Sequence, residues 1–372
     1  MREKIENRKI NVRELFFVLL SLFLPFQYGL ALLEKQYGTL SFLHLMVAGV
    51  CGLLLAKLYY FWYNNFGNLS FGHIFTKTFG RVFGKIILGI YLLAFWAVII
   101  DLSYTLSYVW GTIRNHDPMG MMLIIVFLAA IMAISDKTVI SRLANFVVFP
   151  ALVLLLIGIA LSLSSGSMGN LSALKFTDSF DVIFPSSYGF AMTFGLAVMV
   201  LPFLKDLIVT GGEMDFNKGK LKEKKAFQCL LLAVLVGFAF LVLLAFRNLA
   251  TLGNSIGFYD LPFVQTLKLF SLGDSFSQLE IFGILLFESI GITGLAFAFC
   301  SINEVTCQLI PIKSKGFLSV SWAALTYLAV FVLFAQPNNM IEKLIGCTNS
   351  AVWLSAVIIP AFALLVDKMR KH

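Results

Sequence analysis

The sequence predicts an all-α membrane protein of ten transmembrane helices, arranged as two inverted repeats of five. Three observations lead to this prediction: the apolar composition, the length of the apolar runs and the distribution of Lys and Arg. Of the 372 residues, 59% are hydrophobic and 13% are charged, whereas a soluble domain has roughly 25% charged residues. Continuous apolar runs such as 230–246 indicate helices, because the strands of a membrane barrel would show short alternating segments.

Each transmembrane helix needs roughly 20 mainly apolar residues. The predicted spans are 14–33, 40–63, 86–110, 119–135, 140–163, 182–206, 227–247, 278–303, 317–335 and 345–366. We expect the mildly amphipathic segment 71–85 to lie along the cytoplasmic surface of the membrane. The segment 251–277 is long for a connection between helices, and we expect it to form a helix over the bundle, either as a lid or as a plain surface helix.

The Lys and Arg residues predict the orientation. With the N-terminus in the cytoplasm, 21 of the 28 Lys and Arg residues fall in cytoplasmic segments and six in outer segments, with Lys57 inside the second span. This distribution obeys the positive-inside rule and places both termini in the cytoplasm. The net charge of +8 is thereby explained by contact with anionic lipid, and nucleic acid is not an expected partner.

Ten spans within one domain, 1–372, divide into a first repeat, 1–163, and an inverted second repeat, 182–367. Inverted repeats of five helices are a common plan of membrane transporters. In these transporters the first helix of each repeat is broken near mid-membrane, and its freed backbone groups bind the ligand. The first and sixth spans both contain Pro and Gly residues that weaken a helix. The candidate ligand-binding residues at these two breaks are Pro25, Gln27, Tyr28 and Gly29, and Tyr188, Gly189, Thr193 and Gly195. Ordinary kinks or close helix packing are the alternative explanation.

Two carboxyls, Asp101 and Glu288, are predicted inside the third and eighth spans. Ionisable groups within a membrane are usually functional. Counted from the predicted outer ends of their spans, the two lie at similar depths, so we expect them to line one cavity and to bind a proton. Tyr104 and Tyr108 share the helical face of Asp101, and these two tyrosines and both carboxyls are further candidate ligand-binding residues. The alternative is that both carboxyls only serve helix packing.

The sequence gives little support to an enzyme. It has no P-loop, no G-x-S-x-G and no H-E-x-x-H motif, and its four histidines show no metal-binding spacing. We expect no catalytic residues, no metal and no cofactor.

Three segments resemble one known family. They are Ile10-Asn-Val-Arg-Glu-Leu-Phe-Phe17, the glycine-containing entry to the third span at 74–93, and the stretch before the eighth span at 259–280. Together with the length and the ten-span layout, they resemble the B subunits of spore germination receptors, a permease-like branch of the amino acid–polyamine–organocation superfamily. Gln278 replaces an expected arginine, and the broken region of the sixth span lacks an expected acidic residue, so the chain resembles a divergent member.

The resemblance implies a LeuT-like five-plus-five bundle that senses a small germinant, often an amino acid. It also implies assembly with a larger A-type membrane subunit and a C-type lipoprotein in the inner membrane of a spore. Two alternatives stay open. One is a proton- or sodium-coupled amino-acid permease in which Glu288 or Asp101 carries the proton, and the other is a membrane scaffold with a vestigial substrate site.

Overall fold

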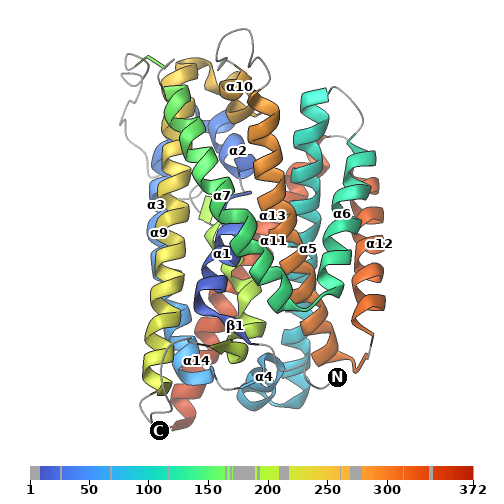
Figure 1. Cartoon of the computed structure of the whole chain (residues 1–372). Helices are drawn as coiled ribbons and strands as arrows, with labels where there is room; N and C mark the ends of the chain where they lie inside the picture. Colours follow the sequence, from blue (N-terminus) through green and yellow to red (C-terminus); the bar gives the residue numbers. More distant parts are fainter. Residues whose placement is uncertain are drawn as a thin grey trace.

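The structure is a computed structural model of the whole chain, and its helices run side by side in one bundle (Figure 1). It describes residues 9–25, 27–67, 69–114, 118–163, 166–167, 170, 189–190, 193–208, 218–259, 261–268, 279–312, 314–334 and 338–371. The α-helices are α1 Val12–Phe23, α2 Gln27–Tyr37, α3 Ser41–Phe66, α4 Phe71–Phe79, α5 Arg81–Arg114, α6 Met119–Ile134, α7 Lys137–Leu163, α9 Lys218–Leu252, α10 Pro262–Lys268, α11 Leu279–Leu309, α12 Lys315–Phe334, α13 Asn338–Trp353 and α14 Ile359–Lys371.

Shorter elements connect or interrupt these helices. They are the 3₁₀ helices η1 Gly38–Leu40, η4 Phe194–Asp206 and η5 Gly253–Phe258, the π-helical turn η7 Leu354–Ile358, and the strands β1 Ile10–Asn11 and β2 Leu207–Ile208. β1 and β2 form a two-stranded parallel sheet.

The prediction of an all-helical membrane protein is confirmed. Within the described residues, seven helical segments are long and apolar enough to cross a membrane. They are Ser41–Phe66, Arg81–Gly111, Lys137–Leu163, Lys225–Phe258, Ile281–Leu309, Lys315–Val332 and Gly346–Arg370. Their outer faces expose large apolar side chains such as Leu54, Phe146 and Leu328. Lipid is the solvent in which such a surface is stable.

The segment predicted to lie along the membrane surface forms α4. A glycine ends this helix, because Gly80 adopts a φ of +86° that side chains with a Cβ rarely adopt. The chain then turns sharply into α5. At the start of α5, Gly84 packs so close to α4 that an added Cβ would lie 2.7 Å from the backbone nitrogen of Thr76. Both glycines therefore serve this turn.

The first span lies inside the bundle rather than at its surface. Almost every residue of α1 from Leu15 to Phe23 is buried, and α1 packs against α7, α9 and α11. The long connection after α9 contains η5 and α10, which pack against α2, α9 and α11. The expected helical segment therefore exists in the described part of 251–277, and its role as a lid stays a prediction.

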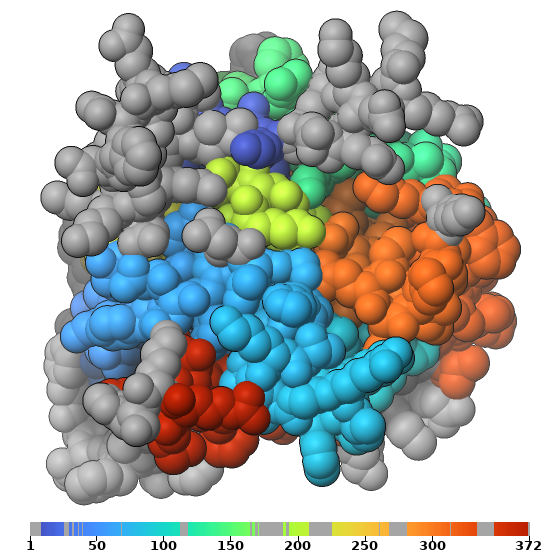
Figure 2. Space-filling model, turned by 90° about the horizontal axis from the view of Figure 1, so that it is seen from below, coloured from blue at the N-terminus to red at the C-terminus, as the bar shows by residue number. Residues whose placement is uncertain are grey.

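The bundle has two distinct ends. β1, α4 and α14 lie at one end, which we call the β1 end, and α2 and α10 lie at the other, which we call the α10 end (Figure 1). Seen from the β1 end, the yellow-green residues of η4 occupy the middle of the face, between the blue residues of α3 and α4 and the orange residues of α11 (Figure 2). The β1-end half of the sixth span thus lies at the centre of the bundle.

Candidate functional site

The first span is broken where the sequence predicts. α1 ends at Phe23 and α2 begins at Gln27, and the buried residue Pro25 lies in the turn between them. Proline has no N–H for a helical hydrogen bond, so the carbonyl of Ser21, four residues earlier, lacks its usual helical donor. Gln27, Tyr28 and Gly29 open α2, but their side chains lie outside the described residues.

The sixth span also changes conformation at its predicted break. Residues 189–190 are helical, Thr193 is a buried turn residue, and η4 begins at Phe194. Two glycines here are packing positions. An added Cβ on Gly189 would lie 3.2 Å from Leu33 of α2, and one on Gly195 would lie 2.5 Å from Val352. Tyr188 lies outside the described residues.

The two breaks lie next to each other. The ring of Phe23, the last residue of α1, meets the ring of Phe194, the first residue of η4, edge to face at 5.5 Å between centroids. Gly189 packs on α2 just beyond this pair. Residues about 170 positions apart in the chain are thus brought together by folding, as the paired-break hypothesis requires.

Glu288 on α11 is buried and only partly satisfied. Its side chain accepts a hydrogen bond from Trp110 of α5. Among the residues that the structure describes, Oε2 has no hydrogen-bond partner, and the residue is 4% exposed. Buried polar atoms in proteins are almost always paired. An unpaired carboxylate oxygen inside an apolar bundle therefore marks a place where a proton, a water or a ligand donor fits.

The structure separates Asp101 from Glu288. Gly291 of α11 packs directly on Leu106 of α5, and Trp110 bonds Glu288. The higher residue number on α5, Trp110, meets the lower one on α11, Glu288, so the two helices are antiparallel. In this register Asp101 is level with a position about eight residues beyond Glu288, which is about 12 Å along the axis. The packing therefore does not place the two carboxyls at one depth, and a cavity shared by both stays a prediction.

Glu288, in contrast, lies level with the first break. Gly294 of α11 packs against the backbone carbonyl of Ser21 in α1, and α1 and α11 run in opposite directions (Figure 1). Pro25 follows Ser21 by four residues, just beyond the end of α1. In this register it is level with a part of α11 that lies within about one helical turn of Glu288. On α5, Tyr104 and Tyr108 lie between the levels of Asp101 and Glu288. Their rings stack with 5.9 Å between the ring centroids.

A second buried polar cluster was not predicted. Arg247 of α9 is 1% exposed, and its Nη2 donates to Asn248 Oδ1 at 2.9 Å and Phe263 O at 3.0 Å, and also to Thr266 Oγ1. Asn248 Nδ2 in turn donates to both carboxylate oxygens of Glu34 in α2, at 3.0 and 3.2 Å. This cluster joins α2, α9 and α10.

The sequence contains one sign of this cluster, at the end of the predicted seventh span. Arg247 is the last residue of the predicted seventh span, 227–247, yet α9 continues to Leu252 and buries it. This sign is the Arg-Asn pair, Arg247 and Asn248, which directly follows a long apolar run and so brings polar side chains into a membrane helix. Within the described residues, no three His, Cys, Asp or Glu side chains are grouped so that they could hold a metal ion.

Comparisons with known proteins agree with this architecture. The family model Spore_permease, described as spore germination protein, matches residues 15–339. A nucleobase-cation-symport-1 family transporter, solved in a closed conformation with bromovinylhydantoin bound, is similar with a TM-score of 0.64 at 12% identity, over 95% of this chain and 78% of that one. A manganese transporter from Eremococcus coleocola is similar with a TM-score of 0.65 at 13% identity, over 95% of this chain and 77% of that one. At such low identity these likenesses show the fold alone. No curated protein matches the chain.

Proposed function

Because the chain belongs to the spore germination protein family, we propose that it is a permease-like subunit of a germinant receptor. It binds a small germinant, an amino acid or a similar nutrient, and the bound ligand shifts the bundle between conformations that signal germination. The observation that carries this proposal is the meeting of the two helix breaks at Phe23 and Phe194, level with the half-satisfied carboxyl of Glu288.

The proposed ligand site consists of backbone groups from both breaks and one side chain from α11. The turn residues Leu24 and Pro25 supply backbone carbonyl acceptors, because the N–H of Leu24 already donates to Leu20 and proline has no N–H. The start of η4 supplies backbone donors. Glu288 Oε2 supplies an acceptor for an ammonium group, which is the part of an amino acid that carries hydrogen-bond donors. Gln27, Tyr28, Gly29 and Tyr188 remain proposed members of this site, and Asp101 becomes its more distant neighbour.

The proposed architecture is ten spans in two inverted halves, 1–163 and 182–367. The seven long helical segments, the short apolar helix α6 and the two broken spans together support ten crossings. β1 and α14 lie at the same end of the bundle (Figure 1), which supports both termini being on the cytoplasmic side. There the basic residues of α4 and α14 would meet anionic lipid.

The proposed assembly follows from the family. We place the chain in the inner membrane of a spore, together with an A-type membrane subunit and a C-type lipoprotein. The bundle supplies the ligand site, and the partner subunits receive its change of conformation.

A second candidate function is a proton- or sodium-coupled amino-acid permease. The observation that favours it is that similar solved structures are transporters, together with the unpaired oxygen of Glu288, which suits a coupling proton. A scaffold with a vestigial substrate site is the third candidate, and it requires Glu288 to be dispensable.

One matched pair of variants separates the three candidates. In spores of a deletion strain complemented with the chain, Glu288→Gln should reduce the germination response to a panel of amino acids, sugars and nucleosides at least roughly tenfold, the effect of losing one charged hydrogen bond of about 1.4 kcal/mol or more. Asp101→Asn is the control, because it makes the same chemical change about 12 Å away, and it should leave the dose response nearly unchanged.

The same variants decide between sensing and transport. Purified chain in proteoliposomes should move no labelled amino acid under a proton or sodium gradient if it is a receptor. Uptake that Glu288→Gln abolishes would establish the permease instead. A normal germination response in Glu288→Gln spores would remove Glu288 from the site and favour the scaffold.

A further inference from the structure

Two short strands join the ends of both broken spans. β1 directly precedes α1 and β2 directly follows η4, and they pair in parallel with Ile10 opposite Leu207 and Asn11 opposite Ile208. Ile10 and Leu207 are buried. From the β1 end, the dark blue start of the chain adjoins the yellow-green residues of η4 (Figure 2). Backbone hydrogen bonds therefore tie the β1-end half of the first span to that of the sixth.

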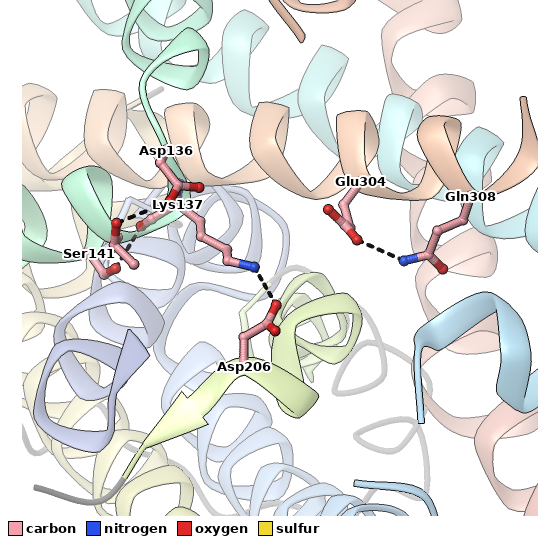
Figure 3. A network of polar contacts seen from close by, with 7 residues as sticks. Asp136, Lys137, Ser141, Asp206, Glu304 and Gln308 are labelled. Atoms are coloured by element: carbon pink, nitrogen blue, oxygen red, sulfur yellow. Dashed lines mark hydrogen bonds and ion pairs between the residues drawn. The ribbon is translucent and has the colours of Figure 1, made fainter. Parts of the chain in front are cut away.

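An ion pair fixes the end of η4 to α7. Lys137, the first residue of α7, pairs with Asp206, the last residue of η4 (Figure 3). The side chains are only 14% and 21% exposed, and the ammonium lies 5.2 Å from the ring centre of Phe203. A lysine at a helix N-terminus faces the unfavourable end of the helix dipole. The carboxylate of Asp206 compensates for this position.

A second ion pair fixes α1 to the same helix. Arg142 of α7 lies 3.5 Å from Glu14 of α1. The other oxygen of Glu14 accepts a hydrogen bond from the backbone N–H of Asn11 in β1 at 3.1 Å. The Arg142 side chain is 65% exposed, so water screens this pair and makes it the weaker of the two.

We propose that Lys137 and Arg142 are positioning residues that hold the β1-end halves of both broken spans against α7, and that the β1–β2 pair makes these halves move as one body. The middle of η4 is anchored separately, because Ser301 of α11 donates to the carbonyl of Met199 at 2.8 Å. Release of Lys137 therefore swings the end of η4, and β1 with α1 follows. These positioning roles do not depend on the identity of the ligand, or on whether the chain senses or transports it.

Three native thiols report on this movement. Cys300 is buried on α11 and lines the same cleft as Lys137 and Phe203. Cys229 of α9 is buried and donates to the carbonyl of Val12 at 3.0 Å, so it reports on the start of α1. Cys51 on α3 is half-buried and serves as the control. The experiment uses three single-cysteine versions of the full chain in detergent micelles, each with the other four cysteines replaced by Ala.

Maleimide labelling rates test the proposal. Lys137→Ala should raise the labelling rate of Cys300 roughly tenfold, which corresponds to about 1.4 kcal/mol in the opening equilibrium. Cys229 should rise by a similar factor through the β1–β2 pair, while Cys51 stays unchanged. Asp206→Asn breaks the same ion pair from the other side and should reproduce these rates. Arg142→Ala should have a smaller effect, and Lys137→Arg and the charge swap K137D/D206K should restore slow labelling.

Each other outcome overturns a stated part of the proposal. An unchanged Cys300 rate in both Lys137→Ala and Asp206→Asn would show that the ion pair does not hold η4. A rise at Cys300 without a rise at Cys229 would show that the two halves move separately. An equal rise at Cys51 would show general loosening of the bundle instead of a positioning role.

Discussion

Glu34 and Glu288 are both buried carboxyls in the same bundle, but their surroundings differ. Both oxygens of Glu34 accept hydrogen bonds from Asn248, and the guanidinium of Arg247 bonds that same amide. Glu288 has one bond, from Trp110, and an oxygen without a partner among the described residues. Glu34 therefore has both oxygens paired in the cluster at the α10 end, where the buried atom without a partner among the described residues is Nε of Arg247. Glu288 has an unpaired carboxylate oxygen itself and lies level with the helix breaks.

The difference separates a structural cluster from the proposed ligand site. A buried charge that lies beside an opposite charge and accepts hydrogen bonds holds elements together, and removal of one partner strongly destabilises the fold. A buried polar atom without a partner destabilises the empty protein, so it is retained where a ligand or a proton completes it. The Glu34 cluster therefore joins α2, α9 and α10, and the unpaired oxygen of Glu288 supports its place in the proposed ligand site.

The largest expected effect is the loss of the buried cation. Arg247→Met removes the donor to Phe263, Thr266 and Asn248 and leaves Glu34 without its neighbouring positive charge. The free energy of unfolding, measured by SDS titration in mixed micelles, should fall by about 3–5 kcal/mol. The double variant E34Q/R247M should recover part of this loss, and a fall below about 1 kcal/mol in the single variant would show that Arg247 does not stabilise the cluster.

A smaller effect is expected from the amide that links the two charges. Asn248→Leu removes the donor to both oxygens of Glu34 and should lower the free energy of unfolding by about 1–3 kcal/mol. Thr251→Val is the matched control one turn further along α9, because its hydroxyl only bonds the carbonyl of Arg247 within the same helix. If both variants lose the same stability, Asn248 has no special role in the cluster.

The smallest effect on stability is expected at Glu288, the carboxyl with an unpaired oxygen. Glu288→Gln keeps the shape of the side chain and an acceptor for Trp110, so in the same SDS titration its free energy of unfolding should change by less than about 1 kcal/mol. The ligand response should nevertheless be lost. A destabilisation as large as that of Arg247→Met would identify Glu288 as a packing residue and erase the contrast with Glu34.

Much of the fold was predictable because it depends on local chemistry. Apolar runs predicted α3, α5, α7 and α11 to within a few residues at most ends, and the break at Pro25 followed from a residue that cannot continue a helix. The family resemblance, carried by three short segments, is confirmed by the match over residues 15–339.

The depths of the carboxyls were not predictable by counting residues. That count assumed that each helix begins and ends at the membrane surface, but α5 has 34 residues and α11 has 31. Their register is set where Gly291 admits the side chain of Leu106, and this contact moves Asp101 away from Glu288. Glycines at helix contacts let backbones approach and so decide which residues are level.

The sequence by itself determined that this protein is a helical membrane bundle with a weak point in its first and sixth spans, because solvent preference and helix-breaking residues act locally. Only the tertiary structure decided which polar groups meet. Arg247 lies more than 200 residues after Glu34 in the chain, yet it joins Glu34 through Asn248. Lys137 and Asp206 are 69 residues apart, and they form an ion pair between α7 and η4. Such pairings depend on helix register and packing, which no local pattern records.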